Sequence, residues 1–396
     1  MQPAETATPA RNYYLDWLRV IAILGVFIFH SQRFFDSYDW HVKNETTYAT
    51  LNTVETIGGM WGMPLIFVIS GASAYYSIRK NGAARFFKQR ALRLLVPLAV
   101  SIFTLGALMV YLERISHHQY VGSFFSWLPR YFDGWFGYGG NFAWMGLHLW
   151  YLEALFIFSL LLLPVFAWTL QGSGRRVLAW LGSLLSTPGV IYLLALPVIV
   201  LLILIDPRGG ILANHNFGGW SLPIYIFFFL NGFLLVSTQQ LQESLHKLRW
   251  ISLAGSLALL AILLKLVPGQ ALPSFGTSRY TLVMSLYGLD AWCGVLAILG
   301  FTMKRLTRQT LFLAYANEAV LPFYVIHQPV LLIIGFFIVQ WPLSDLLKWA
   351  VIILASLVVI LAIYEFAIRR VNPVRLLFGL KPMSAHPIMQ PVKIYE

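Results

Sequence analysis

The sequence predicts an all-α membrane protein, a polytopic bundle of about ten transmembrane helices. Three observations predict this fold class. The 396-residue chain is 58% hydrophobic and only 11% charged, whereas about a quarter of a typical soluble protein is charged. Its mean hydropathy is +0.70. Apolar runs of membrane-spanning length recur from residue 13 to residue 368, with no soluble domain between them.

The expected helices follow from the apolar runs and the polar or helix-breaking residues that separate them. The fifth run is interrupted by Thr187-Pro188-Gly189, which predicts a kink or an unwound segment there. The ten spans are expected near residues 13–34, 52–77, 94–114, 144–168, 178–205, 221–238, 250–267, 280–303, 312–339 and 347–368.

The distribution of basic residues predicts that both ends of the chain face the cytoplasm. With a cytoplasmic amino terminus, nineteen of the 28 lysines and arginines fall on the inner side, eight fall in or beside outer loops, and Arg19 lies within the first span. Positive charge accumulates on the cytoplasmic side of membrane proteins. We therefore expect a short cytoplasmic tail at 1–12, a transmembrane domain at 13–368 and a basic cytoplasmic tail at 369–396. The polar start of the chain predicts no cleaved signal peptide.

The net charge of +12 follows the membrane topology, so we expect lipid contact and no nucleic-acid partner. The single cysteine, Cys293, excludes an intrachain disulfide and a cysteine-based metal cluster. The histidine spacings match no zinc motif, so neither a metal nor a permanently bound cofactor is expected.

The first span, LDWLRVIAILGVFIFH at 15–30, carries three ionisable side chains in an otherwise apolar helix. At 100° per residue, Arg19 and His30 lie within about 20° of each other and about 16 Å apart along the axis. Asp16 lies one turn before Arg19 on the same face. Ionisable groups at bilayer depth pair or face a polar cavity, so this column predicts a shared interior site. The alternative is a structural Asp16–Arg19 pair with an interfacial histidine.

A basic segment follows the second span. The stretch RKNGAARFFKQRALR at 79–93 contains six cations, and Asn81-Gly82 is expected to bend the chain within it. Such a charge density suits a polyanionic cytosolic ligand, for example the phosphates of a nucleotide. Positive-inside bias and attraction to anionic lipid explain the same charges. The six residues are Arg79, Lys80, Arg85, Lys88, Arg90 and Arg93.

Four further polar residues lie at membrane depth: Ser70 in the second span, His148 and Glu153 in the fourth, and His327 in the ninth. Each has a simple interpretation as a structural residue of its own helix. Several imidazoles and one carboxylate that converge in one bundle would instead form an acid–base site. The outer loops are rich in Trp and Tyr, which predicts either an interfacial aromatic belt or a surface on which sugar rings stack.

Taken together and in order, these stretches resemble the membrane-bound acyltransferase family 3 over nearly the whole chain. Three later stretches are similar to the glucan-biosynthesis group of that family. The family pattern has paired glutamates on the fourth span, where this chain has only Glu153. The matching pieces are "LD" at 15–16, Arg19 and His30 with ten residues between them, "FVISG" at 67–71, "RLLVP" at 93–97 and "IHQP" at 326–329, and for the group "WHV" at 40–42, "HLWYL" at 148–152 and "YE…LLFGLKP" at 364–382.

The resemblance implies an enzyme of the bacterial inner membrane that moves an acyl group, succinyl or acetyl, from cytosolic acyl-CoA to a hydroxyl of a periplasmic or cell-envelope glycan. Succinyl-CoA or acetyl-CoA would be the donor substrate. His30 would act as a general base or carry the acyl group transiently, Arg19 would position the donor with Asp16 behind it, and the basic segment would bind the CoA phosphates. The alternative from another class is a transporter or flippase for a glycan or a small anion.

Overall fold

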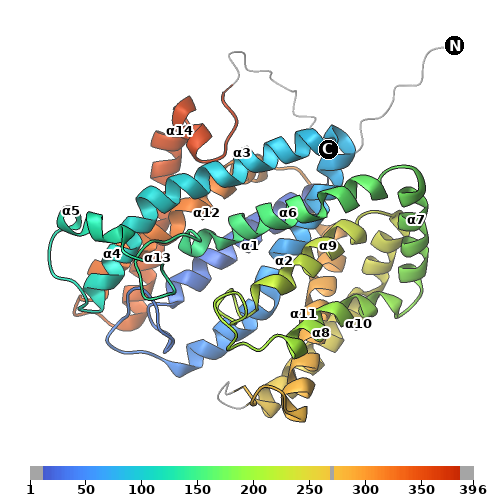
Figure 1. Cartoon of the computed structure of the whole chain (residues 1–396), viewed down its shortest axis with the longest axis horizontal. Helices are drawn as coiled ribbons and strands as arrows, with labels where there is room; N and C mark the ends of the chain where they lie inside the picture. Colours follow the sequence, from blue (N-terminus) through green and yellow to red (C-terminus); the bar gives the residue numbers. More distant parts are fainter. Residues whose placement is uncertain (1–11, 268–271, 384–396) are drawn as a thin grey trace.

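The structure is a computed structural model that describes residues 12–267 and 272–383, and within these ranges it contains helices and loops but no β-strand (Figure 1). The predicted fold class is confirmed. The helices are α1 (Tyr13–Gln32), α2 (Ala49–Asn81), α3 (Ala83–Ser101), α4 (Ala107–Ser116), α5 (Phe124–Trp127), α6 (Trp150–Thr169), α7 (Gly172–Ser186), α8 (Leu196–Leu204), α9 (Tyr225–Leu235), α10 (Gln239–Leu266), α11 (Ser278–Arg305), α12 (Leu311–Ile338), α13 (Asp345–Ala362) and α14 (Asn372–Leu377).

Eight helical segments of the described residues are long and apolar enough to cross a membrane, and they coincide with eight of the ten predicted spans. The other two differ from simple spans. The fifth is a bent pair in which Gly172–Ser186 and Val190–Leu204 meet at 113°. The break falls at the predicted Thr187-Pro188-Gly189, where Gly189 adopts a φ of +86°. The sixth is a shorter apolar helix, Leu222–Leu235.

The loops gather at two opposite ends of the bundle. We call the end where α1 begins the near end and the end where α1 finishes the far end. At the near end, Tyr13 Oη donates to Gln309 Oε1 over 2.7 Å. At the far end, Tyr48 Oη donates to Asp345 Oδ2 over 2.7 Å. Segments predicted for one side of the membrane therefore meet at one end, and the side that each end faces stays a prediction. The predicted amino-terminal tail at 1–12 lies outside the described residues except for Asn12. The predicted carboxyl tail at 369–396 is described as far as residue 383 and contains α14.

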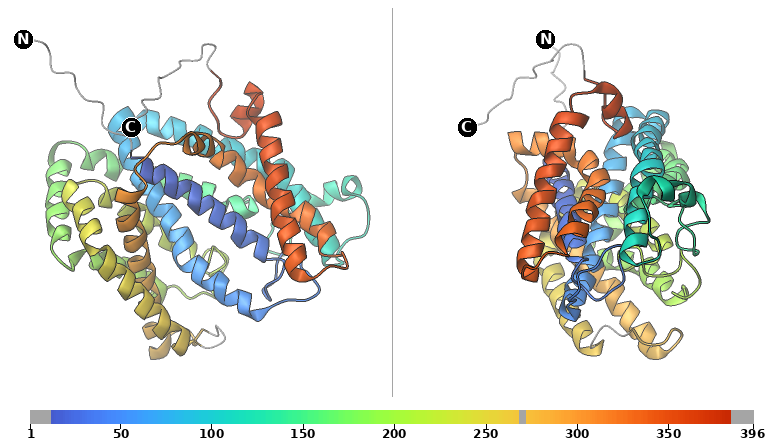
Figure 2. Two further views of the ribbon diagram at one scale, coloured as in Figure 1. Left: turned by 180° about the vertical axis from the view of Figure 1, so that it is seen from behind. Right: turned by 90° about the vertical axis from the view of Figure 1, so that its left-hand side faces the viewer.

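The helix that carries the polar column is central to the bundle. Figure 2 shows α1 in dark blue between α2 on one side and the orange helices α12 and α13 on the other, and α1 packs against all three. The polar side chains of α1 are thus surrounded by other helices. A bonding partner for each polar side chain can come from neighbours that are distant in sequence.

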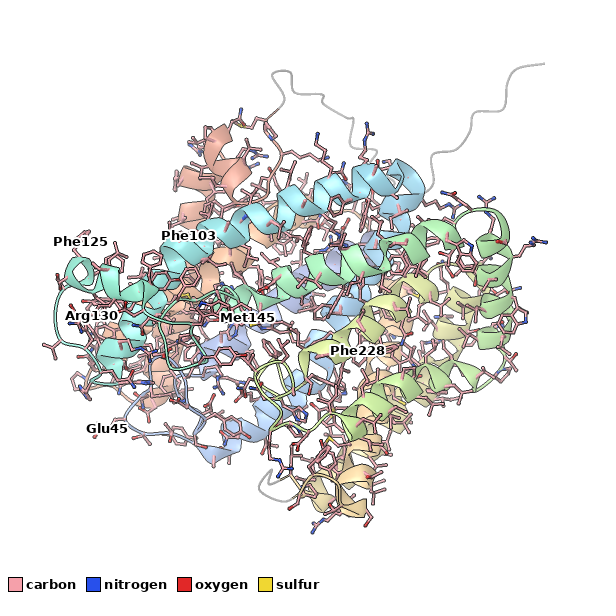
Figure 3. The ribbon with its side chains drawn as sticks, viewed as in Figure 1. Glu45, Phe103, Phe125, Arg130, Met145 and Phe228 are labelled. Carbon is pink, nitrogen blue, oxygen red and sulfur yellow. The ribbon has the colours of Figure 1, made fainter. Side chains whose placement is uncertain are left out.

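A small aromatic core caps the far end beside α4. Trp127 and Tyr131 are fully buried there, and Tyr131 Oη donates to the carbonyl of Ile102 over 2.6 Å. Burial raises the pKa of Tyr131 to about 12. Figure 3 shows Phe125 and Arg130 at the outer edge of this cap. The cap fixes the chain from 117 to 146, which forms one wall of the site described below.

Two glycines let α2 and α9 cross in direct backbone contact. A Cβ atom at Gly71 would lie 1.9 Å from the carbonyl oxygen of Phe229, and one at Gly232 would lie 2.0 Å from that of Val68. Small residues of this kind allow close helix approach within membranes. The crossing holds α2, which carries Ser70 and Ser73, in a fixed position.

We expect Gly71→Ala to lower the thermal stability of the detergent-solubilised protein. The added methyl group would force the two backbones apart, and overpacking of this kind costs about 1–3 kcal/mol. The matched control is Gly62→Ala on the same helix, where a Cβ atom meets nothing within 4 Å. Melting temperatures followed by intrinsic tryptophan fluorescence test the pair. Equal melting curves would show that the crossing is not a tight constraint.

Candidate functional site

Arg19 joins three helices near the near end of the bundle. Its guanidinium donates to Asp16 Oδ1 and Asn317 Oδ1, each over 3.1 Å, and to Ser73 Oγ over 2.8 Å. The Asp16–Arg19 pair is therefore present, as the helical spacing indicates. Ser73 on α2 and Asn317 on α12 complete the arrangement, and neither is part of a motif recognised in the sequence. The side chain of Arg19 keeps 32% of its surface exposed.

The basic segment is helical on both sides of one sharp break. Gly82, with a φ of +79°, separates α2 from α3, in agreement with the bend expected at Asn81-Gly82. Arg90 and Arg93 lie close enough to Arg19 to repel it electrostatically. Arg90 also donates to the carbonyl of Ser70 over 3.2 Å. Arg93 is an exposed residue. The other four cations are exposed as well, and they take no part in this group: Arg79, Lys80, Arg85 and Lys88.

His30 and His327 form a direct imidazole pair across α1 and α12. His30 Nδ1 lies 2.8 Å from His327 Nε2, and the rings stack with centroids 5.1 Å apart. His327 Nδ1 lies 2.6 Å from the carbonyl oxygen of Tyr324, which can only accept. His327 Nδ1 therefore carries the proton, and its Nε2 accepts from His30 Nδ1. The consequence is a fixed tautomer of neutral His30, with the lone pair on Nε2.

His148 is the third imidazole of this cluster. Its ring packs edge-on against His327 with centroids 5.2 Å apart. His148 Nε2 donates to the carbonyl of Val325 over 3.1 Å, and its own carbonyl accepts from Tyr324 Oη over 2.5 Å. The structure thus brings together the three histidines that the sequence placed in three different spans.

Two of the predicted site residues do not join the histidines. Glu153 lies outside the cavity described next, and its Oε2 is buried without a hydrogen-bond partner. Ser70 shares a 2.5 Å hydrogen bond with Tyr151 Oη on α6 and supports the wall of the site from behind. The carboxylate expected beside the imidazoles comes instead from elsewhere in the chain.

A cavity of about 1010 Å³ occupies the far end and reaches the histidine cluster. On α1 its lining begins at Ala22, so Arg19 lies outside it and His30 within it. Aromatic rings cover much of its wall, including those of Trp40, Phe136 and Trp150. Trp40 stacks on His30 with an interplanar angle of 13°. Both the size and the aromatic lining suit an organic ligand larger than a single small ion.

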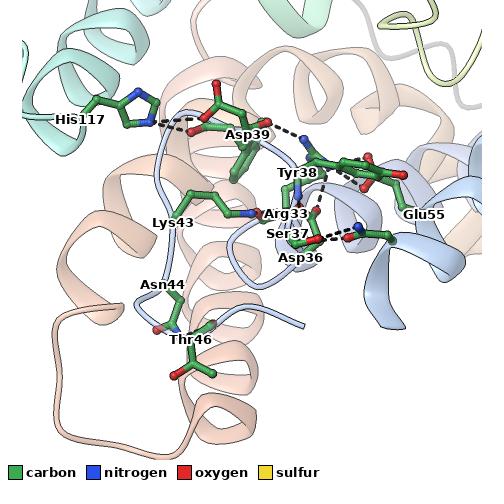
Figure 4. Close-up of polar contacts among 12 residues, drawn as sticks. Arg33, Asp36, Ser37, Tyr38, Asp39, Lys43, Asn44, Thr46, Glu55 and His117 are labelled. Atoms are coloured by element: carbon green, nitrogen blue, oxygen red, sulfur yellow. Dashed lines mark hydrogen bonds and ion pairs between the residues drawn. The ribbon is translucent and has the colours of Figure 1, made fainter. Parts of the chain in front are cut away.

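An ion-pair network fixes the loop that forms the mouth of this cavity (Figure 4). Arg33 contacts Asp36 over 2.9 Å and Glu55 over 2.5 Å, and it donates to the carbonyl of Asp39 over 2.8 Å. Lys43 binds the other oxygen of Asp36 over 2.9 Å. Burial lowers the pKa of Lys43, and the hydrogen bond to Asp36 opposes this shift. The network holds Trp40 in place beside His30.

A second polar pair lines the cavity and joins the same loop to α4. His41 Nδ1 is hydrogen-bonded to Glu113 Oε2 on α4, and both residues are about 8% exposed. Arg114 binds the other carboxylate oxygen of Glu113 over 3.0 Å. His41 lies in the "WHV" stretch at 40–42, and no sequence pattern singles out Glu113. Among the described residues, no group of three or more His, Cys, Asp or Glu side chains is arranged to hold a metal ion.

Comparison with known proteins finds one family over most of the chain. Residues 12–365 match the family described as "Acyltransferase domain". The chain is also 25% identical over 391 residues to the "Glucans biosynthesis protein C" of Salmonella heidelberg, covering 95% of this chain and 97% of that protein. The protein of the same name from Salmonella paratyphi B is 25% identical over 392 residues, with the same coverage. No solved structure matches.

Proposed function

Because the chain belongs to the family described as "Acyltransferase domain", we propose that this multi-pass membrane protein transfers an acyl group from acyl-CoA to a hydroxyl of an extracytoplasmic glycan. The relatives are named for glucan biosynthesis, which supports a glycan as the acceptor. The observation that carries the proposal is His30, whose fixed tautomer leaves a basic nitrogen on a ring that lines the far-end cavity. In this proposal the protein lies in the bacterial inner membrane with its near end in the cytoplasm.

The donor is acyl-CoA, with succinyl or acetyl as the acyl group. Three arginines support this choice, because Arg19, Arg90 and Arg93 lie close together and repel one another. A polyanion would relieve that repulsion, and arginine forks suit phosphate oxygens. The phosphates would thus be held at the near end. The pantetheine arm would carry the thioester along α1 toward His30, about 16 Å farther along the axis.

His30 supplies the chemistry in either of two ways. As a general base, Nε2 takes the proton of the acceptor hydroxyl while the oxygen attacks the thioester carbon. As a nucleophile, Nε2 first takes the acyl group and passes it to the acceptor in a second step. In both, His327 orients the ring and stabilises the protonated or acylated form through the Nδ1–H hydrogen bond.

The acceptor enters from the far end. The rings of Trp40, Phe136 and Trp150 offer flat apolar faces for a sugar, and the polar groups of the same wall offer hydrogen bonds to its hydroxyls. This assignment favours sugar stacking as the role of part of the outer aromatic residues. Those outside the cavity keep the interfacial role that Trp and Tyr have in membranes.

The test is acyl transfer by the purified protein in proteoliposomes of known orientation. Acetyl-CoA or succinyl-CoA is supplied at the near end and an oligoglucan at the far end. We expect release of free thiol on one side and an ester on the glucan on the other, detected by mass spectrometry. Glucan that crosses the membrane without thiol release would instead favour a transporter. A protein that consumes neither acyl-CoA would contradict the proposal.

Arg93→Gln should raise the KM for acyl-CoA by about 10- to 100-fold, because a charge-assisted contact to phosphate contributes roughly 1.5–3 kcal/mol. The matched control is Arg85→Gln, an exposed cation on the same helix that does not approach Arg19. High salt should weaken donor binding in the wild type as well. If these cations serve only lipid attraction, both variants should keep the wild-type KM in detergent.

A further inference from the structure

The His41–Glu113 pair has the form of a carboxylate–imidazole dyad. An ionised carboxylate can only accept, so the proton of the shared hydrogen bond belongs to His41 Nδ1. The lone pair of neutral His41 is then on Nε2. Arg114 favours the ionised carboxylate, and it is itself fixed by Asn141 Oδ1 over 2.8 Å and by the carbonyl of Gly140 over 3.0 Å. The dyad therefore presents one oriented, basic imidazole nitrogen.

The dyad shares its cavity with His30. Both members line the same space as His30, and Trp40, the residue directly before His41, stacks on the His30 ring. His41 lies close enough to His30 and His148 to act on both electrostatically. It comes from the far-end loop, the side from which the acceptor arrives, whereas His30 terminates the column that begins with Arg19. Two basic imidazoles thus reach one reaction space from different sides.

We propose that the His41–Glu113 dyad is the base that activates the acceptor hydroxyl, while His30 takes the acyl group from the donor. The inference rests on the proposed acyl transfer and goes beyond it by dividing the reaction between two imidazoles. A nitrogen that is bonded to the acyl carbon has no lone pair left to accept a proton. A covalent route through His30 therefore requires a second base, and the dyad supplies it.

The proposed reaction has two steps. His30 Nε2 adds to the thioester carbonyl, the C–S bond breaks, and the departing thiolate takes a proton from solvent. The acceptor hydroxyl then gives its proton to His41 Nε2 while its oxygen adds to the acyl carbon. The bond between that carbon and His30 Nε2 breaks and restores the lone pair, and His41 releases its proton to solvent. Glu113 stabilises the imidazolium form of His41 between these two events.

A structural role of His41 and a role as general base predict different activities for His41→Asn. His41→Asn places an amide nitrogen where Nδ1 was, so the tie to Glu113 is kept, but the basic Nε2 is gone. We expect acylation of an oligoglucan to fall by about 100-fold or more, the usual contribution of a general base. Exchange of labelled CoA into acyl-CoA without acceptor reports only the His30 step, and it should stay within about threefold of wild type. The control is His118→Asn, the same change at an exposed histidine.

Glu113→Gln tests whether the carboxylate acts through His41. It should lower kcat for glucan acylation without raising either KM, and it should add no further loss in the His41→Asn background, since the two residues work as a unit. If the hydrogen bond between His41 and Glu113 is only structural, His41→Asn should keep its activity. Glu113→Gln should then cause the same loss in the wild-type and the His41→Asn backgrounds.

The outcomes separate this inference from the proposed function. A wild-type protein that neither exchanges CoA nor acylates glucan would overturn both. A wild-type protein that acylates glucan without exchanging CoA would overturn the division of the reaction and leave acyl transfer intact. His41→Asn that acylates glucan within threefold of wild type, or that loses exchange and acylation equally, would overturn the dyad alone.

Discussion

We expect His30→Ala to abolish acyl transfer, with a loss of about 10³-fold or more, while the affinity for acyl-CoA stays within about threefold of wild type. The loss is this large because the variant removes the nitrogen that takes the acyl group from the thioester, and nucleophilic groups contribute on this scale. Donor affinity persists because Arg19, Arg90 and Arg93 lie outside the far-end cavity. Transfer and donor binding are measured side by side on membrane-inserted protein.

His30→Asn sharpens this result. The amide nitrogen of asparagine overlies Nδ1 and keeps the donor to His327, but the position of Nε2 is left without a base. We expect the same loss as for His30→Ala, with loss of CoA exchange as well. His118→Asn serves as the control for the substitution itself. Near-normal turnover in His30→Asn would return this histidine to a structural role, as the alternative interpretation of the first span holds.

We expect His327→Leu to lower kcat by about 100-fold and to leave the KM for acyl-CoA unchanged. Without the acceptor at His327 Nε2, the His30 ring populates both tautomers and more than one orientation, which removes the lone pair from the reacting position for most of the time. Loss of a tautomer-setting partner costs up to about 10⁴-fold in a comparable hydrogen-bonded triad. Steady-state kinetics measure the fall in kcat, and the ¹⁵N chemical shifts of the His30 imidazole measure the change in its tautomer population.

His327→Gln distinguishes positioning from packing. The amide oxygen of glutamine can reach the place of Nε2 and accept from His30 Nδ1, although the bond to the Tyr324 carbonyl is lost. We expect a partial rescue relative to His327→Leu, with the ¹⁵N shifts of His30 returned toward wild type. If both variants lose the same activity and the shifts do not move, His327 would act only by filling space.

The helices of this fold could be predicted from the sequence, but most of the contacts between them could not. Hydropathy alone located every long helix, because a lipid-facing chain must satisfy its backbone within each helix. Helical spacing placed Asp16 with Arg19. It could not identify Asn317, because that partner is 298 residues away in the chain and only tertiary packing brings it close.

The site was harder to predict for the same physical reason. His30 and His327 are 297 residues apart, and the hydrogen bond that fixes their tautomers follows from the way α1 packs against α12. Glu153 was the carboxylate predicted to join the histidines, because it lies near His148 in the sequence. The carboxylate that meets an imidazole is Glu113, which looks in sequence like an ordinary polar residue at a helix end. The fold of the 33–48 loop depends on a charge network that no local pattern predicts.

The Arg19 junction has a consequence for the electrical integrity of the membrane. Polar groups at both ends of a membrane protein and along its central helix favour hydration of its interior. A continuous chain of water molecules across the membrane would conduct protons and dissipate the ion gradients of a cell. Arg19 lies outside the far-end cavity and is held by side chains of three helices. A fixed guanidinium at such a point repels hydronium and sodium ions, as arginine does in water-selective channels. Under the proposed function, the positive charge that opposes the passage of cations would also attract the polyanionic donor.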